Sequence, residues 1–148
     1  MNNPAKTFLK QYTALQAQYD SIKRDMAKRR ECLTSISAPM GGDAVQSSSS
    51  DRMASVIASI IDSEVDLAET ARQIERTLRE ILEAIASVPD AMQKTVLTLR
   101  YVEGLDWIKV SERINYEISN TYIIHGRALV EVNKWMNDHN IVGNCSCQ

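Results

Sequence analysis

The stretch VPDAMQKTVLTLRYVEGLDWIKVSERINY, residues 88–116, decides the fold because it contains several helix boundaries at short intervals. Ser87 stands where a helix N-cap is expected, with Pro89 in the first turn and Asp90 closing a capping box. The apolar pattern continues to Tyr101, and Gly104 ends the helix because glycine accepts left-handed backbone. The first part of the stretch therefore predicts one short helix.

The second part predicts a turn between two further helices. Asp106 can cap a helix over Trp107–Ile114, and Asn115 suits the left-handed residue that follows it. A longer helix is predicted over Ile118–Met136, where an apolar stripe recurs at helical spacing. Three helices joined by short turns outline a helix-turn-helix.

Two long heptad patterns precede this stretch. In each, positions spaced alternately four and three residues apart are apolar, from Phe8 to Ile36 and from Met53 to Val88, and the only polar residues at these positions are Arg29 and Glu64. If the two helices pack antiparallel along these apolar stripes, here called seams, the residues that lie opposite each other have numbers that sum to 89 or 90. Arg29 then comes close enough to Glu64 for an ion pair. A flanking row that includes Ile61 and Val65 widens the second apolar face. Heptads do not specify orientation, so a parallel dimer of each helix is the alternative.

These patterns predict an all-α fold, with a long antiparallel helical hairpin followed by a three-helix helix-turn-helix module. The hairpin is predicted over residues 1–86 with a flexible Ser- and Gly-rich loop over 37–52. The helix-turn-helix module is predicted over 87–137, and a disordered tail over 138–148.

Composition narrows the function classes. There is no run of about 18 apolar residues and no apolar leader at the N-terminus, so we expect a cytoplasmic protein without membrane contact. No phosphate loop, metal-spaced His set or nucleophile–base pattern is present, so we expect no enzyme and no cofactor. Cys145 and Cys147 lack the further ligands of a zinc site. The chain carries a net charge of −2, so DNA binding would depend on local placement of cations.

Residues 88–135 resemble region four of bacterial sigma factors. The resemblance rests on the Pro89 turn, Val96-Leu97-x-Leu99-Arg100-Tyr101, Glu103-Gly104-Leu105 and Val110-Ser111-Glu112-Arg113-Ile114. The continuation Tyr122-x-x-His125-Gly126-Arg127-Ala128-Leu129 is similar to a subset of such proteins. These are helix-turn-helix transcriptional regulators encoded by phages and mobile elements of Gram-positive bacteria. The resemblance implies that 118–136 is a recognition helix and that His125 has a structural place between helices.

The same resemblance implies which residues contact DNA. Base contacts in a helix-turn-helix come from the first turns of the recognition helix, and phosphate contacts from the helix before it. The DNA-binding residues expected on this basis are Ser119, Asn120, Tyr122, Ile123, Arg127, Lys109 and Arg113. For Arg127, an intramolecular bond to Glu103 or Glu131 is the alternative.

Several residues depart from the sigma pattern. Lys109 replaces the usual Glu, Ser111 the usual Ala, and Asn115 the usual Gly. Glu117 stands where a capping Ser is common, and Ile123 occupies a position that is often basic. Either the module reads a different sequence, for instance through a thymine methyl, or its DNA binding is weakened or lost.

Two functions are therefore weighed. The first is a sequence-specific transcription regulator that binds double-stranded DNA, with the hairpin forming a homodimer or contacting RNA polymerase. The second is a phage-type inhibitor or adaptor that binds another host protein and keeps the helix-turn-helix as a scaffold. The wide apolar face over Met53–Val88 favours a homodimer in either case.

Overall fold

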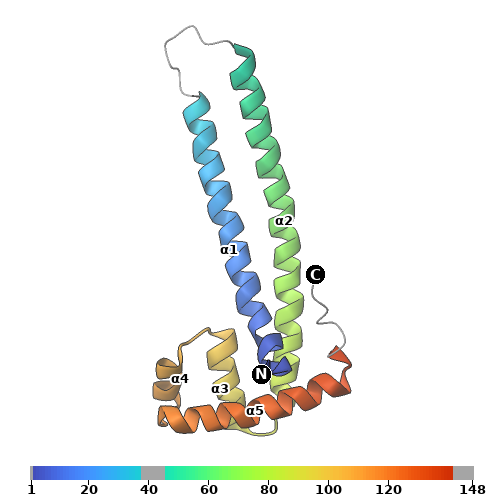
Figure 1. Cartoon of the computed structure of the whole chain (residues 1–148), viewed down its shortest axis with the longest axis vertical. Coiled ribbons are helices and arrows are strands. Elements are labelled where there is room, and N and C mark those ends of the chain that lie inside the picture. Colours follow the sequence, from blue (N-terminus) through green and yellow to red (C-terminus); the bar gives the residue numbers. More distant parts are fainter. Residues whose placement is uncertain (1, 38–45, 142–148) are drawn as a thin grey trace. The chain divides into compact units, whose positions relative to one another are not determined.

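The computed structural model describes residues 2–37 and 46–141, and every regular element in these ranges is helical (Figure 1). The chain runs through α1 (Pro4–Ser37), α2 (Gln46–Ser87) and α3 (Ala91–Leu97), which continues as a π-helical segment, η1 (Thr98–Val102). It ends with α4 (Trp107–Ile114) and α5 (Ile118–Asp138). The predicted all-α class, with an antiparallel α1–α2 pair followed by shorter helices, is confirmed. None of the described helices is both long and apolar enough to cross a bilayer.

The chain divides into two compact units, and the division runs through both long helices. One unit, here called the helix-turn-helix unit, combines residues 1–14 with 74–148, and the other, the hairpin unit, consists of 15–73. The predicted boundary at Ser87 lies inside the first unit. The reason is that both the start of α1 and the end of α2 contribute side chains to the core beneath α5.

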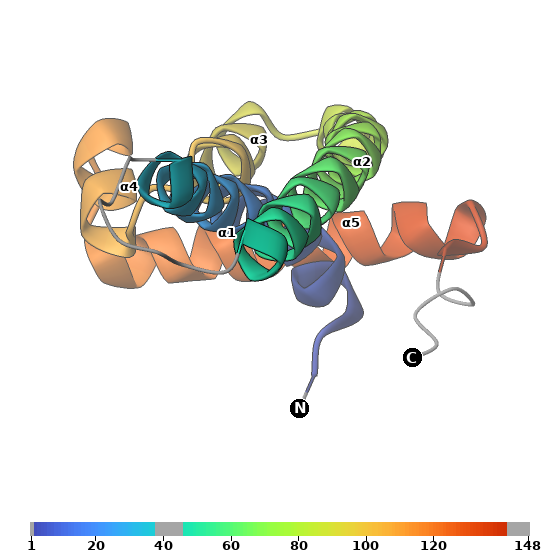
Figure 2. The same ribbon diagram turned by 90° about the horizontal axis from the view of Figure 1, so that it is seen from above.

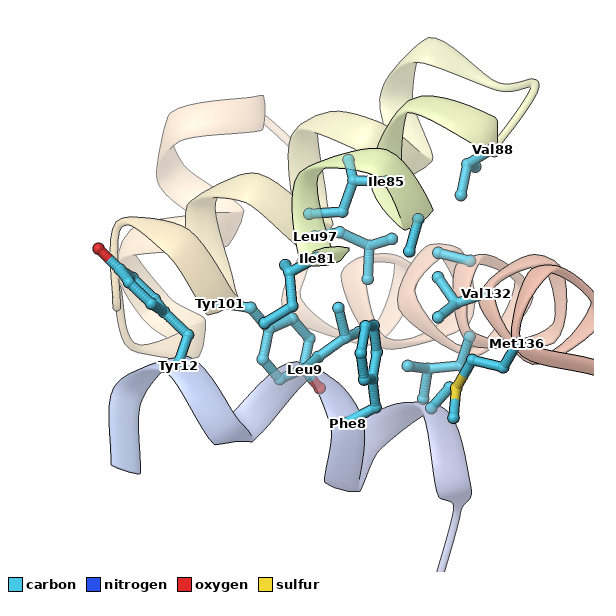
Figure 3. Close-up of a cluster of buried hydrophobic side chains, with 14 residues drawn as sticks. Phe8, Leu9, Tyr12, Ile81, Ile85, Val88, Leu97, Tyr101, Val132 and Met136 are labelled. Carbon is cyan, nitrogen blue, oxygen red and sulfur yellow. The ribbon is translucent and has the colours of Figure 1, made fainter. Parts of the chain in front are cut away.

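The core of the helix-turn-helix unit draws on four helices (Figure 3). Phe8 and Leu9 from α1 and Ile81 from α2 meet Leu97 and Val132 in one apolar cluster. Within this unit, α5 packs against both α3 and α4 (Figure 2). A second cluster holds α3 to α4 and consists of Val96, Leu99, Val110 and Ile114. The surface that α4 and α5 present is therefore supported by two apolar clusters.

The caps of the short helices agree with the sequence in most places. Asp106 Oδ1 accepts a hydrogen bond from the Lys109 amide at 2.9 Å, and Gly104 has a φ of +73°, as predicted. The predicted N-cap at Ser87 is wrong, because Ser87 ends α2 and its hydroxyl donates to the Ala84 carbonyl. Asp90 is the N-cap of α3 instead, and its Oδ1 accepts from the Gln93 amide at 2.8 Å.

The hairpin unit uses a different seam on α2 from the predicted one. Both seams share Ile60 and Leu67, but Ser63 and Thr70 are buried where Glu64 and Ala71 were expected. In this unit, every second position of the observed seam lies one residue earlier in the chain than predicted, and the predicted seam is wrong at those positions. The flanking row of Ile61 and Val65, expected to widen a buried face, is exposed.

Arg29 supplies the physical reason for this change. Its Nη1 donates to the Ser59 carbonyl at 3.1 Å and to Ser63 Oγ at 2.8 Å, so a guanidinium in the seam is satisfied by oxygen atoms of α2. The predicted Arg29–Glu64 ion pair is wrong as well. Glu64 pairs with Arg30 at 3.2 Å, on the surface.

The predicted loop and tail are described only in part. Helix α1 ends at Ser37 and helix α2 begins at Gln46, so the prediction of a loop over 37–52 is wrong for 37 and for 46–52. Residues 38–45 lie outside the described residues, as do 142–148 of the predicted tail with Cys145 and Cys147. The helix α5 includes Asp138, one residue into the region that was predicted to be disordered.

Candidate nucleic-acid interface

A three-residue turn connects α4 to α5 in the geometry of a helix-turn-helix. Asn115 has φ 58° and ψ 45°, the left-handed conformation that the sequence predicts. The amide of Tyr116 donates to the Ser111 carbonyl at 3.1 Å, which closes the end of α4. Glu117 then precedes α5 without a capping side-chain hydrogen bond. The left-handed conformation of Asn115 and the closed end of α4 thus fix where α5 begins.

The first two turns of α5 present the expected base-reading residues together. Ser119, Asn120, Tyr122 and Ile123 are all exposed, whereas Thr121 is fully buried and points to the opposite side of the helix. A helix with this division exposes one face over its first two turns, on which polar and apolar side chains are mixed. That is the part of a recognition helix from which base contacts are made.

Tyr122 has a packing role in addition to its exposed hydroxyl. Its ring lies 4.9 Å from the ring of Trp107, centroid to centroid, and Trp107 also contacts His125 at 4.7 Å. The Arg100 guanidinium lies 5.0 Å from the Trp107 ring, and its Nη1 donates to the Leu105 carbonyl at 2.7 Å. Arg100 therefore helps to position the ring on which Tyr122 rests.

Sequence reasoning missed this role of Arg100. The available signal was a single cation within the largely apolar run Val96–Tyr101, where an exposed position is not expected. Pattern alone does not reveal that the guanidinium reaches forward to Trp107, because the contact depends on the tight turn at Gly104.

His125 is buried between helices, as the sigma resemblance implied. Its Nε2 and the Tyr101 hydroxyl share a hydrogen bond of 2.9 Å. Burial, with smaller contributions from the positive charges of Lys6 and Arg100, lowers the pKa of His125 from 6.5 to about 4. Burial likewise raises the pKa of the Tyr101 hydroxyl to about 12. Both groups are thus neutral at physiological pH and serve to join η1 to α5.

Lys109 and Arg113 lie on α4 as predicted, and both are exposed. They line a shallow depression of about 360 Å³ together with Leu105 and Glu112. The Lys109 ammonium lies 3.7 Å from Asp106 Oδ2, so part of its charge is balanced locally. The two cations are close enough to contact the same stretch of phosphate backbone, but the neighbouring acidic groups reduce the local potential.

Arg127 lies one turn beyond the base-reading residues and is exposed. It lines a depression of about 280 Å³ with Asp90 and Glu131 among its neighbours. Glu131 pairs with Lys134 at 2.7 Å. Arg127 is therefore accessible to a phosphate at the edge of the surface formed by α5.

The same surface is unusually apolar for a contact with DNA. Five large apolar or aromatic side chains from α4, the turn and α5 are exposed there, namely Ile108, Tyr116, Ile118, Tyr122 and Ile123. Isolated exposed apolar residues are common, whereas a group on adjacent elements often marks an interaction site.

Glycine at position 126 is not required by the fold, which leads to a stability prediction. A β-carbon at Gly126 would have no neighbouring atom within 4 Å, and its backbone is helical. Gly126→Ala is therefore expected to raise the free energy of unfolding by about 0.5–1 kcal/mol, measured by urea denaturation. Gly104→Ala is the matched control and should lower it, because φ at Gly104 is +73°. A loss of stability in Gly126→Ala would contradict the open environment.

No protein-family model, curated protein or solved structure matches the chain. The interpretation of this surface accordingly rests on the turn geometry, the exposed residues of α5 and the side chains that support them.

Proposed function

We propose that the protein is a sequence-specific DNA-binding transcription regulator of the phage or mobile-element type. In this proposal the N-terminal turns of α5 enter the major groove. The observation that carries it is the α4–Asn115–α5 turn, which presents Ser119, Asn120, Tyr122 and Ile123 on one exposed face over a packed core. A helix-turn-helix uses this part of its second helix to read bases.

The exposed residues supply chemistry for base reading. The Asn120 amide can both donate to and accept from the edge of an adenine. The Tyr122 hydroxyl can donate to a base or a phosphate, and its ring is held by Trp107. Ile123 cannot form hydrogen bonds, but it can contact a thymine methyl. The expected site is therefore rich in A·T pairs at the positions that α5 reads.

Phosphate contacts in this proposal come from Lys109 and Arg113 on α4 and from Arg127 on α5, all of which are exposed. Residues 87–140 contain six Lys or Arg and seven Asp or Glu, so non-specific attraction is weak. Affinity must then depend on base contacts more than in a strongly basic module, and a low salt dependence is expected.

A second candidate function is favoured by the apolar surface around Tyr116 and Ile118. A protein-binding inhibitor or adaptor would use Ile108 and its exposed neighbours as its contact surface. Glu117, exposed in the turn between Tyr116 and Ile118, would repel phosphates, but it would not exclude a protein partner.

Selection from a random double-stranded DNA library, first at low salt and then near physiological salt, tests the proposal. We expect one motif to be enriched, and Asn120→Ala to weaken binding to it by about 10- to 100-fold. Tyr122→Phe keeps the contact with Trp107 and removes only the hydroxyl, so it isolates the polar contact. Asn137→Ala, at an exposed asparagine near the end of α5, is the matched control and should bind normally.

Two results would count against DNA reading. One is retention of sequence preference in Asn120→Ala with a uniform loss of affinity, which would remove its base-reading role. The other is no enrichment at either salt concentration. If a host protein is then captured by the wild type but not by Ile108→Glu, the second candidate function is supported.

A further inference from the structure

The hairpin unit contains an apolar row on α2 that faces away from its seam. Ile57, Ile61 and Val65 are 43%, 54% and 63% exposed, although Ser63 and Thr70 of the same helix are buried. On this helix, apolar side chains are thus exposed to solvent, while hydroxyl side chains are buried in the seam. A contiguous row of exposed apolar side chains often marks an interaction site.

The row is symmetric about Ile61. Its members are Ala54, Ile57, Ile61, Val65 and Ala68, and the spacings of three, four, four and three residues read the same in both directions. The side chains are also symmetric in size, with small residues at both ends and large ones in the middle. A two-fold interface requires a self-complementary surface, and this row meets that requirement.

We propose that a second copy of this chain packs against the row, antiparallel, with the two-fold axis at Ile61. Residues whose numbers sum to about 122 then lie at the same level, so Ile57 lies near Val65 of the second copy. With Ile57, Ile61 and Val65 at the contact, the two helix axes should lie about 10 Å apart. This proposal does not rest on the proposed DNA binding.

The charges beside the row favour the antiparallel arrangement with a second copy. In a parallel pair, every charge would face its own copy. In the antiparallel pair, Arg72, which pairs with Glu69 of its own helix at 3.4 Å, lies nearly level with Asp51 of the second copy, and both residues are exposed. Glu64, beside Ile61, is already paired with Arg30 at 3.2 Å and does not place an unbalanced charge near the axis.

The size of the contact predicts its strength. A contact over residues 50–72 is about 33 Å long and about 11 Å wide, so the two faces together remove at least about 700 Å² from water. This area is smaller than the roughly 1,200–2,000 Å² of stable interfaces, so the dimer is expected to be weak and transient, with a dissociation constant in the upper micromolar range.

Sedimentation velocity of the full chain at about 5–200 µM tests the proposal. The wild type should change from monomer to dimer over this range. Ile61→Glu, which places two carboxylates at the axis, should raise the dissociation constant by about 100-fold or more. Val130→Glu is the matched control, because Val130 is 53% exposed and lies on α5, and it should leave the dimer intact. Far-UV circular dichroism should show both variants to be folded.

Cross-linking tests the direction of the two helices. In a chain whose three cysteines are replaced by serine, Ile61→Cys should form a disulfide-linked dimer. Ala54→Cys should cross-link only when it is mixed with Ala68→Cys. Cross-linking of Ala54→Cys with itself would overturn the antiparallel arrangement. A monomer at every concentration, or equal dissociation by Val130→Glu, would overturn the proposed interface.

Discussion

Phe8→Ala is expected to lower the free energy of unfolding of the protein by about 3–5 kcal/mol. The Phe8 side chain is only 2% exposed, and its ring lies 6.0 Å from that of Trp135 on α5. Around it lie Ile81 of α2 and Val132 and Met136 of α5 (Figure 3). Truncation therefore leaves a cavity where three helices meet, and the surrounding helices cannot all move in to fill it.

Urea denaturation followed by circular dichroism measures this effect. Lys10→Ala, two residues away on the exposed side of α1, is the control and should change stability by less than about 0.5 kcal/mol. A loss below about 1 kcal/mol for Phe8→Ala would contradict the packing of the start of α1 in the core of the helix-turn-helix unit.

Acidification is the second change with a large expected effect. Burial holds the pKa of His125 at about 4 in the folded protein, against about 6.5 when the chain unfolds. The unfolded chain therefore binds the His125 proton first as the pH falls. This contribution to the free energy of unfolding is fully present above pH 6.5. As the pH falls from about 6.5 to 4, the free energy of unfolding should decrease by about 2–3 kcal/mol.

Unfolding experiments at pH 7.5 and pH 4.5 test this expectation. His125→Gln removes the titrating ring, so it should reduce the loss of stability between the two pH values while lowering stability at pH 7.5. The chain has one other histidine, His139, which is exposed, and His139→Gln should retain the wild-type pH dependence. An unchanged pH dependence in His125→Gln would refute the role assigned to burial.

Local signals in the sequence predicted the short helices well. Asp106, Gly104 and Asn115 act through their own backbone or through an amide three residues away, so their effects do not depend on distant contacts. The exposure of Asn120 and Ile123 also followed from helical periodicity alone. The error at Ser87 was of the same local kind, since Asp90, predicted only to close a capping box three residues further on, made the N-cap itself.

The seam of α2 could not be predicted in the same way. Two heptad phases share Ile60 and Leu67, and apolar content favours the phase that contains Ile57 over the one that contains Ser63. The observed phase satisfies Arg29, whose hydrogen-bond partners lie on the other helix. The choice of this phase depends on a contact between residues 29 and 63, so the periodicity of α1 or of α2 alone does not reveal it.

By itself, the sequence determined the helical class and the turn at Asn115, because each follows from periodicity or from a cap a few residues long. Only the tertiary structure decided that the first turns of α1 belong with α5, that Arg100 supports Trp107, and that Ile61 faces outward. These features depend on side chains that are distant in sequence competing for the same buried space and the same hydrogen-bond acceptors.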